Sequence, residues 1–300
     1  MTENTQAAPQ PIQTWKLTVA YDGTDFQGWQ VQPGLPTIQG DLQSALHRIV
    51  GESPLPQGSG RTDAGVHALA QVASFPLQAR IPPANLLRAL NRTLPGSIRI
   101  IAAEIVPDAF HARHAAVAKT YEYRVLPIEP AAAQICPPFL SRYVYAYSWR
   151  LDLDLLQRAA RAFAGEHDFQ GFAASDPDLA TRTRDSGFPP VRQKRRMDGA
   201  PGDPFGDPSV QIEIRTTVRT IYASEWHEQT REGFNLLIYR VRGNGFLHHM
   251  VRNLVGTMLD VGRGDISLDD VPSILASRDR RLAGPTAPAR GLFLHSVEHQ

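Results

Sequence analysis

The sequence has very little cysteine, no long apolar run and almost no net charge. Cys136 is the single cysteine among 300 residues, so a disulfide framework is excluded and a reducing compartment is expected. No apolar run approaches the roughly 20 residues that a membrane-spanning helix needs. Residues 1–13 are polar and rich in Pro, Gln and Ala, without the apolar centre of a signal peptide. We therefore expect a cytoplasmic protein with a disordered N-terminal tail over residues 1–13.

The charge balance excludes a polybasic tail protein. Lys and Arg total 31 against 30 Asp and Glu, and the formal net charge is +1. Any nucleic-acid surface must therefore come from where the basic residues lie and not from their excess. Apolar residues make up 42% of the chain, which is ample for a packed core. A chain of this length suggests two modules that share a cleft.

Hydrophobic periodicity predicts strands and helices in the first half of the chain. Apolar residues alternate over 15–21, and a helical stripe follows Thr37, a residue type that caps helices. The expected elements are a strand at 15–21, a helix at 38–50, a strand at 68–77, a helix at 82–91 and a strand at 97–106. We assign residues 14–115 to an N-terminal α/β half.

The second half, residues 116–300, has a similar order of elements. We expect strands at 119–126, 210–217, 220–227, 234–241 and 291–295, and helices at 152–164, at 247–261 and near 271–275. Gly262 and Gly264 are expected to end the helix at 247–261. The fold class is therefore α+β. Two split β-α-β (ferredoxin-like) halves with mixed, largely antiparallel sheets would form a central cleft.

An insertion at about 173–209 interrupts the second half. It is rich in Pro, Asp and Gly and lacks lasting periodicity. Residues 182–196 hold six basic side chains and one acidic side chain, Asp185. This segment is either a basic flap that grips phosphates or a solvated, mobile loop.

One loop, residues 58–67, concentrates groups that carry chemistry. Three glycines allow tight turns around Asp63, with Arg61 and His67 nearby, and an alternating apolar strand follows. A carboxylate in this setting can be a nucleophile, a general base, a metal ligand or simply a turn residue bonded to nearby backbone. The loop alone does not decide among these roles.

This loop is one of six short sequence motifs that together resemble a known family. Gly60-Arg-Thr-Asp-Ala-Gly-Val-His67 resembles the signature of the tRNA pseudouridine synthase A family. The blocks at 21–30, 110–113, 119–123, 165–169 and 245–253 resemble the other blocks of that family, in the same order. Together they span roughly residues 15–262, most of the chain.

The resemblance implies an isomerase that converts uridine to pseudouridine in tRNA. The substrate would be the anticodon arm, modified at uridines 38, 39 and 40 after the base is flipped out of its stem. The reaction involves no redox change and no outside reactant, so no cofactor is expected. Family members act as homodimers, which implies the same assembly here. There are two rival interpretations. One is a non-catalytic RNA-binding protein, and the other is a metal-dependent hydrolase that uses Asp63.

The resemblance also assigns the site residues. Asp63 would be the nucleophile, Arg252 its ion-pair partner and Tyr121 the ring on which the uracil stacks, because a nearby guanidinium keeps a carboxylate ionised. The Tyr121 hydroxyl would also be placed to help move the proton from carbon 5; on strand statistics alone Tyr121 would be a core residue. The expected substrate-binding residues are Arg61, Lys119, His67, Phe26, Trp29 and Arg113, besides Tyr121. Phe26 and Trp29 either stack on bases or anchor their loop on the core.

Metal binding has only weak sequence support. His111, His114, His248 and His249 are possible ligands, but no cysteine or paired carboxylate in their motifs completes a site. Asp22 and Asp25 are better explained by an Asx turn than by a magnesium pair. We expect no metal.

Overall fold

The computed structural model describes residues 11–128, 135–174, 216–231 and 233–300. In the first half, the elements follow the predicted order, with one additional two-residue strand, β2. They are β1 (Gln13–Tyr21), α1 (Ile38–Val50), β2 (Gln57–Gly58), β3 (His67–Leu77), α2 (Pro83–Thr93) and β4 (Ile98–Val106). The Thr37 side chain accepts a hydrogen bond from the Gly40 N–H and caps α1, as the sequence predicts.

The second half contributes the longer strands and the most buried helix. Its strands are β5 (Ala116–Pro127), β6 (Tyr145–Tyr147), β7 (Gly165–Asp168), β8 (Val218–Arg231), β9 (Phe234–Gly243) and β10 (Leu292–His299). Its α-helices are α3 (Pro138–Ser141), α4 (Leu153–Ala162), α6 (Met250–Arg263) and α7 (Val271–Ser277). Short 3-10 turns lie at Gln170–Phe172, Leu268–Asp270 and Ala289–Gly291.

The described strands form one continuous sheet in the order β4-β1-β3-β10-β5-β9-β8-β7, with β2 on β3 and β6 on β5. Only the β10–β3 and β5–β6 pairs are parallel; the other pairs among the described strands are antiparallel. The predicted α+β class with a largely antiparallel sheet is confirmed. The sheet is shared by both halves of the chain, so a single layer positions the side chains of both.

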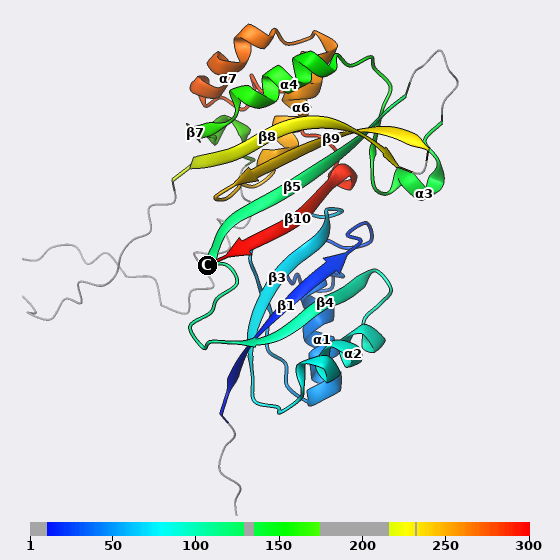
Figure 1. The fold of residues 1–300 in the computed structure, drawn as a ribbon, viewed down its shortest axis with the longest axis vertical. Coiled ribbons are helices and arrows are strands. Elements are labelled where there is room, and N and C mark those ends of the chain that lie inside the picture. Colours follow the sequence, from blue (N-terminus) through cyan, green and yellow to red (C-terminus); the bar gives the residue numbers. More distant parts are fainter. Residues whose placement is uncertain (1–10, 129–134, 175–215, 232) are drawn as a thin grey trace, which may run out of the picture.

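The last strand, β10, joins the two halves. In Figure 1 it lies between β3 and β5. It pairs with β3 at only two positions, Phe293 with His67 and Leu294 with Ala68. On its other edge Leu294 pairs with Tyr121 of β5. The C-terminal strand therefore brings the loop that precedes His67 beside the strand that carries Tyr121.

The helices pack at the two ends of the sheet. Figure 1 shows α1 and α2 with β1, β3 and β4, whereas α4, α6 and α7 lie together near β8 and β9. One large core cluster runs through both halves. Helix α6 is buried on nearly every face because α4, Trp226 of β8 and the backbone at Pro285 all contact it. No helix among the described residues has both the length and the apolar character required to cross a bilayer.

Several predicted boundaries are wrong. Helix α6 begins at Met250 and not at 247, because His249 has the left-handed φ of 59°. It continues through Gly262 to Arg263, and Gly264 is the C-cap. Gln13 belongs to β1 and not to the tail. The sequence did not predict the short strands β6 and β7, because each has too few residues to show an alternating apolar pattern.

Three predicted segments lie outside the described residues. They are residues 1–10, most of the 173–209 insertion with its basic segment at 182–196, and most of the expected strand at 210–217.

Candidate active site

The loop that carries Asp63 is fixed by contact with the loop at 26–30. Trp29 donates its backbone N–H to the carbonyl of Thr62, and Gly65 donates to that of Phe26. A side chain at Gly28, whose φ is +88°, would lie 2.5 Å from the Thr62 carbonyl oxygen. A side chain at Gly58 would lie 2.7 Å from the Trp29 ring. Glycine is required at both positions because backbone and ring approach so closely.

Side chains from the sheet hold the other flank of the loop. The Tyr21 and Thr62 hydroxyls are 2.8 Å apart, and Gln71 donates to the Gly60 carbonyl at 2.8 Å. Lys119 on β5 donates from Nζ to the Ser59 carbonyl at 2.7 Å. Burial lowers the pKa of Lys119 to about 8, with Arg113 and Arg219 adding to the effect. The loop is thus anchored by both halves of the chain.

Arg252, in the first turn of α6, forms an ion pair with Asp63. Its Nη1 lies 3.3 Å from Asp63 Oδ2, and its Nε donates to the Ala287 carbonyl at 2.7 Å. Ala287 in turn donates its N–H to the Arg252 carbonyl. The guanidinium is therefore held at one nitrogen by backbone and offers another to the carboxylate. The side chains of Asp63 and Arg252 are 22% and 15% exposed, so the pair is half-buried and open to the groove on one side.

Two histidines complete the surroundings of Asp63. His248 Nε2 lies 3.5 Å from Oδ1, and His249 Nε2 lies 3.4 Å from Oδ2. Their rings are 3.9 Å apart. Burial lowers the pKa of His249, and His248, Arg252 and Arg280 lower it further, against the opposing effect of Asp63. His248 Nδ1 is buried and has no hydrogen-bond partner among the described residues.

The Tyr121 ring closes the groove beside these groups. It is 7% exposed and meets Phe246 edge-on at 5.0 Å between ring centroids. Burial, together with the nearby Tyr21 and Asp63, raises the pKa of its phenol above the ordinary value. Tyr121 is therefore a neutral phenol that can donate a hydrogen bond but gives up its proton reluctantly.

A groove of about 1720 Å³ surrounds the carboxylate. Its described wall holds seven Arg and Lys side chains and a single carboxylate, that of Asp63. The basic residues are Arg61, Arg113, Lys119, Arg219, Arg252, Arg278 and Arg280. A chain with a net charge of +1 thus concentrates positive charge along one cleft, which suits a polyanionic ligand. His249 and Arg278, the non-glycine residues of the described chain with positive φ, both line it. Strained backbone often accompanies functional sites.

Seven of the nine predicted site residues line this groove: Asp63, Arg252, Tyr121, Arg61, Lys119, Arg113 and Trp29. Trp29 contributes little surface, because it is 1% exposed and packs near Tyr21 with ring centroids 6.2 Å apart. The structure does not bring Phe26 or His67 to the groove wall. Phe26 is 6% exposed and anchors its loop on the core.

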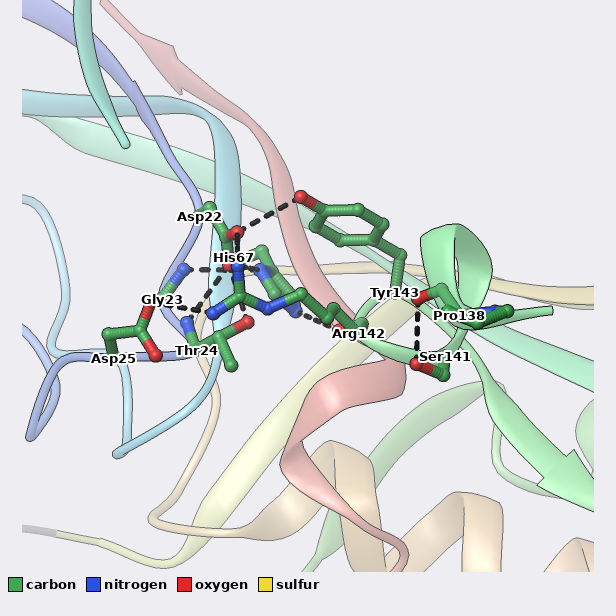
Figure 2. A network of polar contacts seen from close by, with 9 residues as sticks. All are labelled: Asp22, Gly23, Thr24, Asp25, His67, Pro138, Ser141, Arg142 and Tyr143. Carbon is green, nitrogen blue, oxygen red and sulfur yellow. Dashed lines mark hydrogen bonds and ion pairs between the residues drawn. The ribbon is translucent and has the colours of Figure 1, made fainter. Parts of the chain in front are cut away.

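His67 is fully buried in a polar network that joins the two halves (Figure 2). Its Nδ1 accepts from the Gly23 N–H at 3.1 Å, and its Nε2 lies 3.0 Å from the Arg142 carbonyl, to which it donates. Asp22 accepts from both the N–H and the hydroxyl of Thr24, which is the expected Asx turn, and also from the Tyr143 hydroxyl. His67 thus holds the base of the Asp63 loop and cannot reach a ligand in the groove.

Sequence reasoning missed several groove residues. Arg219 on β8 and Arg278 and Arg280, which follow α7, line the groove but were not among the predicted site residues. His248 and His249 were considered only as possible metal ligands that lacked a carboxylate in their own motif. Their closeness to Asp63 is a tertiary contact between residues about 185 positions apart. Asp63, His248 and His249 present ligand atoms within 4.8 Å of one another, so they could together hold a metal ion.

Comparison with known proteins finds relatives along most of the chain. A sequence model of the tRNA pseudouridine synthase family matches residues 17–114 and 206–300. A tRNA pseudouridine synthase A from Solibacter usitatus is 46% identical over 95% of this chain and 98% of its own length. Those from Bacillus pumilus and Bacillus subtilis are 37% and 38% identical, each over 94% of this chain and 97% of their own lengths.

Proposed function

The chain belongs to the tRNA pseudouridine synthase A family, and we propose that it isomerises uridine to pseudouridine in tRNA with Asp63 as the nucleophile. The observation that carries the proposal is the Asp63–Arg252 pair, 3.3 Å apart, in a groove that is otherwise basic. An enzyme of this kind needs a charged carboxylate that is open to an RNA ligand. Asp63 is the single carboxylate in the described groove wall.

The isomerisation breaks the bond between N1 of uracil and C1′ of ribose and forms one between C5 and C1′. The proton on C5 is lost and N1 gains one, so the reaction is balanced without an outside reactant. Asp63 attacks either the ribose or the base and forms a covalent intermediate, within which the N1–C1′ bond is broken and the base rotates. The bond to Asp63 breaks again when the product is formed, so the carboxylate is regenerated. Arg252 pairs with the carboxylate and fixes its direction, because its guanidinium is itself anchored on Ala287.

Tyr121 supports the detached uracil. An aromatic face contributes about 1 to 3 kcal/mol per stacked base, and its protonated hydroxyl can donate to a uracil oxygen. The target base must first leave its stem, which costs a few kcal/mol. Arg61 lies two residues from Asp63 in the groove wall and occupies or guards the space of the flipped nucleotide.

The basic wall offers phosphate contacts to the RNA. Arg113, Lys119 and Arg219 lie on the β4–β5 connection, β5 and β8, so their charges run along the groove from both halves of the chain. Phosphate contacts position an RNA without reading its sequence. That agrees with modification of three neighbouring positions of the anticodon arm, uridines 38, 39 and 40. From family membership we also propose that the enzyme acts as a homodimer in the cytoplasm.

Family membership also leads us to propose that residues 14–115 and 116–300 are two split β-α-β (ferredoxin-like) halves. The order β4-β1-β3 with β2 on β3 supports this division for the first half. The groove is lined from both halves, as two such units joined by β10 would require.

The test is to map pseudouridine in total tRNA treated with the protein or with Asp63→Asn. We expect pseudouridine at anticodon-arm positions with the wild-type protein. The variant should bind tRNA with similar affinity while its activity falls to background, because an amide cannot serve as the nucleophile. Appreciable turnover by Asp63→Asn would reject the assignment. Binding of tRNA without pseudouridine formation by the wild type would favour a non-catalytic RNA-binding protein.

A further inference from the structure

The imidazoles of His248 and His249 face the two oxygens of the same carboxylate. His248 Nε2 lies 3.5 Å from Asp63 Oδ1 and His249 Nε2 lies 3.4 Å from Oδ2. The three side chains are between 22% and 29% exposed, and all three line the groove. A small ion can therefore reach them from solvent.

The ligand atoms of the three side chains lie within 4.8 Å of one another. Zinc binds imidazole nitrogen and carboxylate oxygen at about 2.0 to 2.2 Å, so neighbouring ligands of a tetrahedral site are about 3.3 to 3.6 Å apart. Each imidazole nitrogen is already about this far from one oxygen of Asp63. Because the two imidazoles face different oxygens, a rotation of the carboxylate or of one ring would bring all three ligands around one ion. Two imidazoles and one carboxylate suit zinc and similar transition metals, whereas magnesium and calcium prefer oxygen ligands alone.

The backbone fixes the position of His249. With φ 59° and ψ 1°, this residue forms the N-cap of α6. The ring therefore points at Asp63 from the rigid start of a helix.

Arg252 limits the affinity of such a site. Its Nη1 lies 3.3 Å from Asp63 Oδ2, and its Nε is anchored on the Ala287 carbonyl. A second cation on the same carboxylate is repelled by this guanidinium. A metal ion here would consequently exchange readily and would occupy the lone pairs that Asp63 needs as a nucleophile.

We propose that Asp63, His248 and His249 bind a divalent transition metal, with zinc as the probe, and that the bound ion inhibits the enzyme by occupying Asp63. Metal binding is independent of the proposed function, whereas the inhibition rests on it. The site would make the activity sensitive to free zinc and insensitive to magnesium.

Calorimetric titration of the full chain with Zn²⁺, in the absence of tRNA, tests the site. We expect one ion per chain, and at least tenfold weaker binding in His248→Ala, His249→Asn and Asp63→Asn. Asparagine is chosen at 249 because it tolerates left-handed backbone. The matched control is the double variant His111→Ala/His114→Ala, since those two rings also lie 4.3 Å apart. It should bind zinc as the wild type does, and Mg²⁺ should not bind at comparable concentrations.

A cobalt titration separates a formed site from a misfolded variant. Co²⁺ should give the visible absorption of a tetrahedral site in the wild type and lose it in His249→Asn, while circular dichroism stays unchanged. Zinc binding that persists in His248→Ala and His249→Asn, that disappears in the His111/His114 control, or that is absent from the wild type overturns the site. Binding without loss of pseudouridine formation overturns the inhibition. Zinc binding by a protein that forms no pseudouridine overturns the proposed function and leaves the metal site standing.

Discussion

Asp63 and Arg252 are 189 positions apart in the chain, and the Arg252 guanidinium lies 3.3 Å from the Asp63 carboxylate. The same guanidinium donates to the Ala287 carbonyl at 2.7 Å. Arg252 thus bridges the Asp63 loop and a backbone segment near β10, and both contacts depend on the fork of the guanidinium.

Replacement of Arg252 by lysine tests this bridge. A lysine has one nitrogen and cannot keep the backbone contact while it pairs with Asp63. We expect activity on tRNA to fall about 100-fold, the size of effect that a small misplacement of a reacting group produces, with tRNA affinity changed far less. Arg48→Lys, an exposed position on α1, is the control. A single-turnover rate near that of the wild type would dismiss the ion pair.

Alanine variants at two glycines with positive φ distinguish the cost of backbone strain from the cost of a steric clash next to Asp63. Gly28 and Gly34 have φ of +88° and +73°, but a side chain at Gly28 meets the Thr62 carbonyl whereas one at Gly34 meets nothing within 4 Å. Both Gly→Ala changes should cost about 1 to 2 kcal/mol of backbone strain. Gly28→Ala should cost about 1 to 3 kcal/mol more from overpacking, and activity should fall because the residue before Asp63 is displaced. Equal melting temperatures for the two variants would contradict this account.

Substitutions of Tyr121 separate its ring from its hydroxyl. Tyr121→Phe should keep tRNA affinity within a few-fold, because the stacking face remains. Tyr121→Leu should lose about 1 to 3 kcal/mol of stacking on the flipped base, measured as Kd for tRNA that carries a non-cleavable uridine analogue. A large loss of turnover in Tyr121→Phe with unchanged affinity would assign the proton transfer to the hydroxyl. Equal affinities for the Phe and Leu variants would show that no base rests on this ring.

The basic groove predicts a steep dependence of tRNA binding on salt. Arg113 is exposed and lines the groove. Loss of one phosphate contact in Arg113→Ala should reduce the slope of log K against log salt by about 0.7 to 0.9. Arg99→Ala, an exposed position on β4 outside the described groove wall, should leave the slope unchanged. A wild-type affinity that is insensitive to salt would argue against an RNA-binding groove.

Buried His67 should make stability depend on pH. Burial lowers its pKa, although Asp22 and the Arg142 carbonyl oppose this effect. Below the ordinary histidine value of about 6.5, the unfolded chain binds a proton that the folded chain does not accept until lower pH. Unfolding free energy should therefore fall as the solution is acidified through and below that value.

The measurement is the melting temperature at about pH 7.5 and about pH 5.5, on either side of the ordinary histidine pKa. His67→Gln should be less stable at the higher pH and should lose less on acidification, because the titrating ring is gone. His47→Gln, at an exposed position on α1, serves as the control. An identical pH response of His67→Gln and wild type would remove His67 from the titrating groups.

Local patterns in the sequence were sufficient for the larger elements. The apolar stripe and Thr37 cap predicted α1, and alternation predicted β1 and β3, because their signals come from neighbouring residues. The start of α6 was misplaced by three residues, since nothing in the sequence indicates that His249 adopts left-handed backbone. The short strands β6 and β7 exist only because a neighbouring strand pairs with them.

The sequence by itself determined the family resemblance, the elements that carry Asp63, Tyr121 and Arg252, and the glycines that shape the loop. Only the tertiary structure decided that β10 joins β3 to β5, that His67 is a buried anchor, and that His248 and His249 face the Asp63 carboxylate. The reason is physical. Periodicity and turn chemistry record interactions over a few residues, whereas the distance between groups about 185 positions apart is set by packing of the whole sheet.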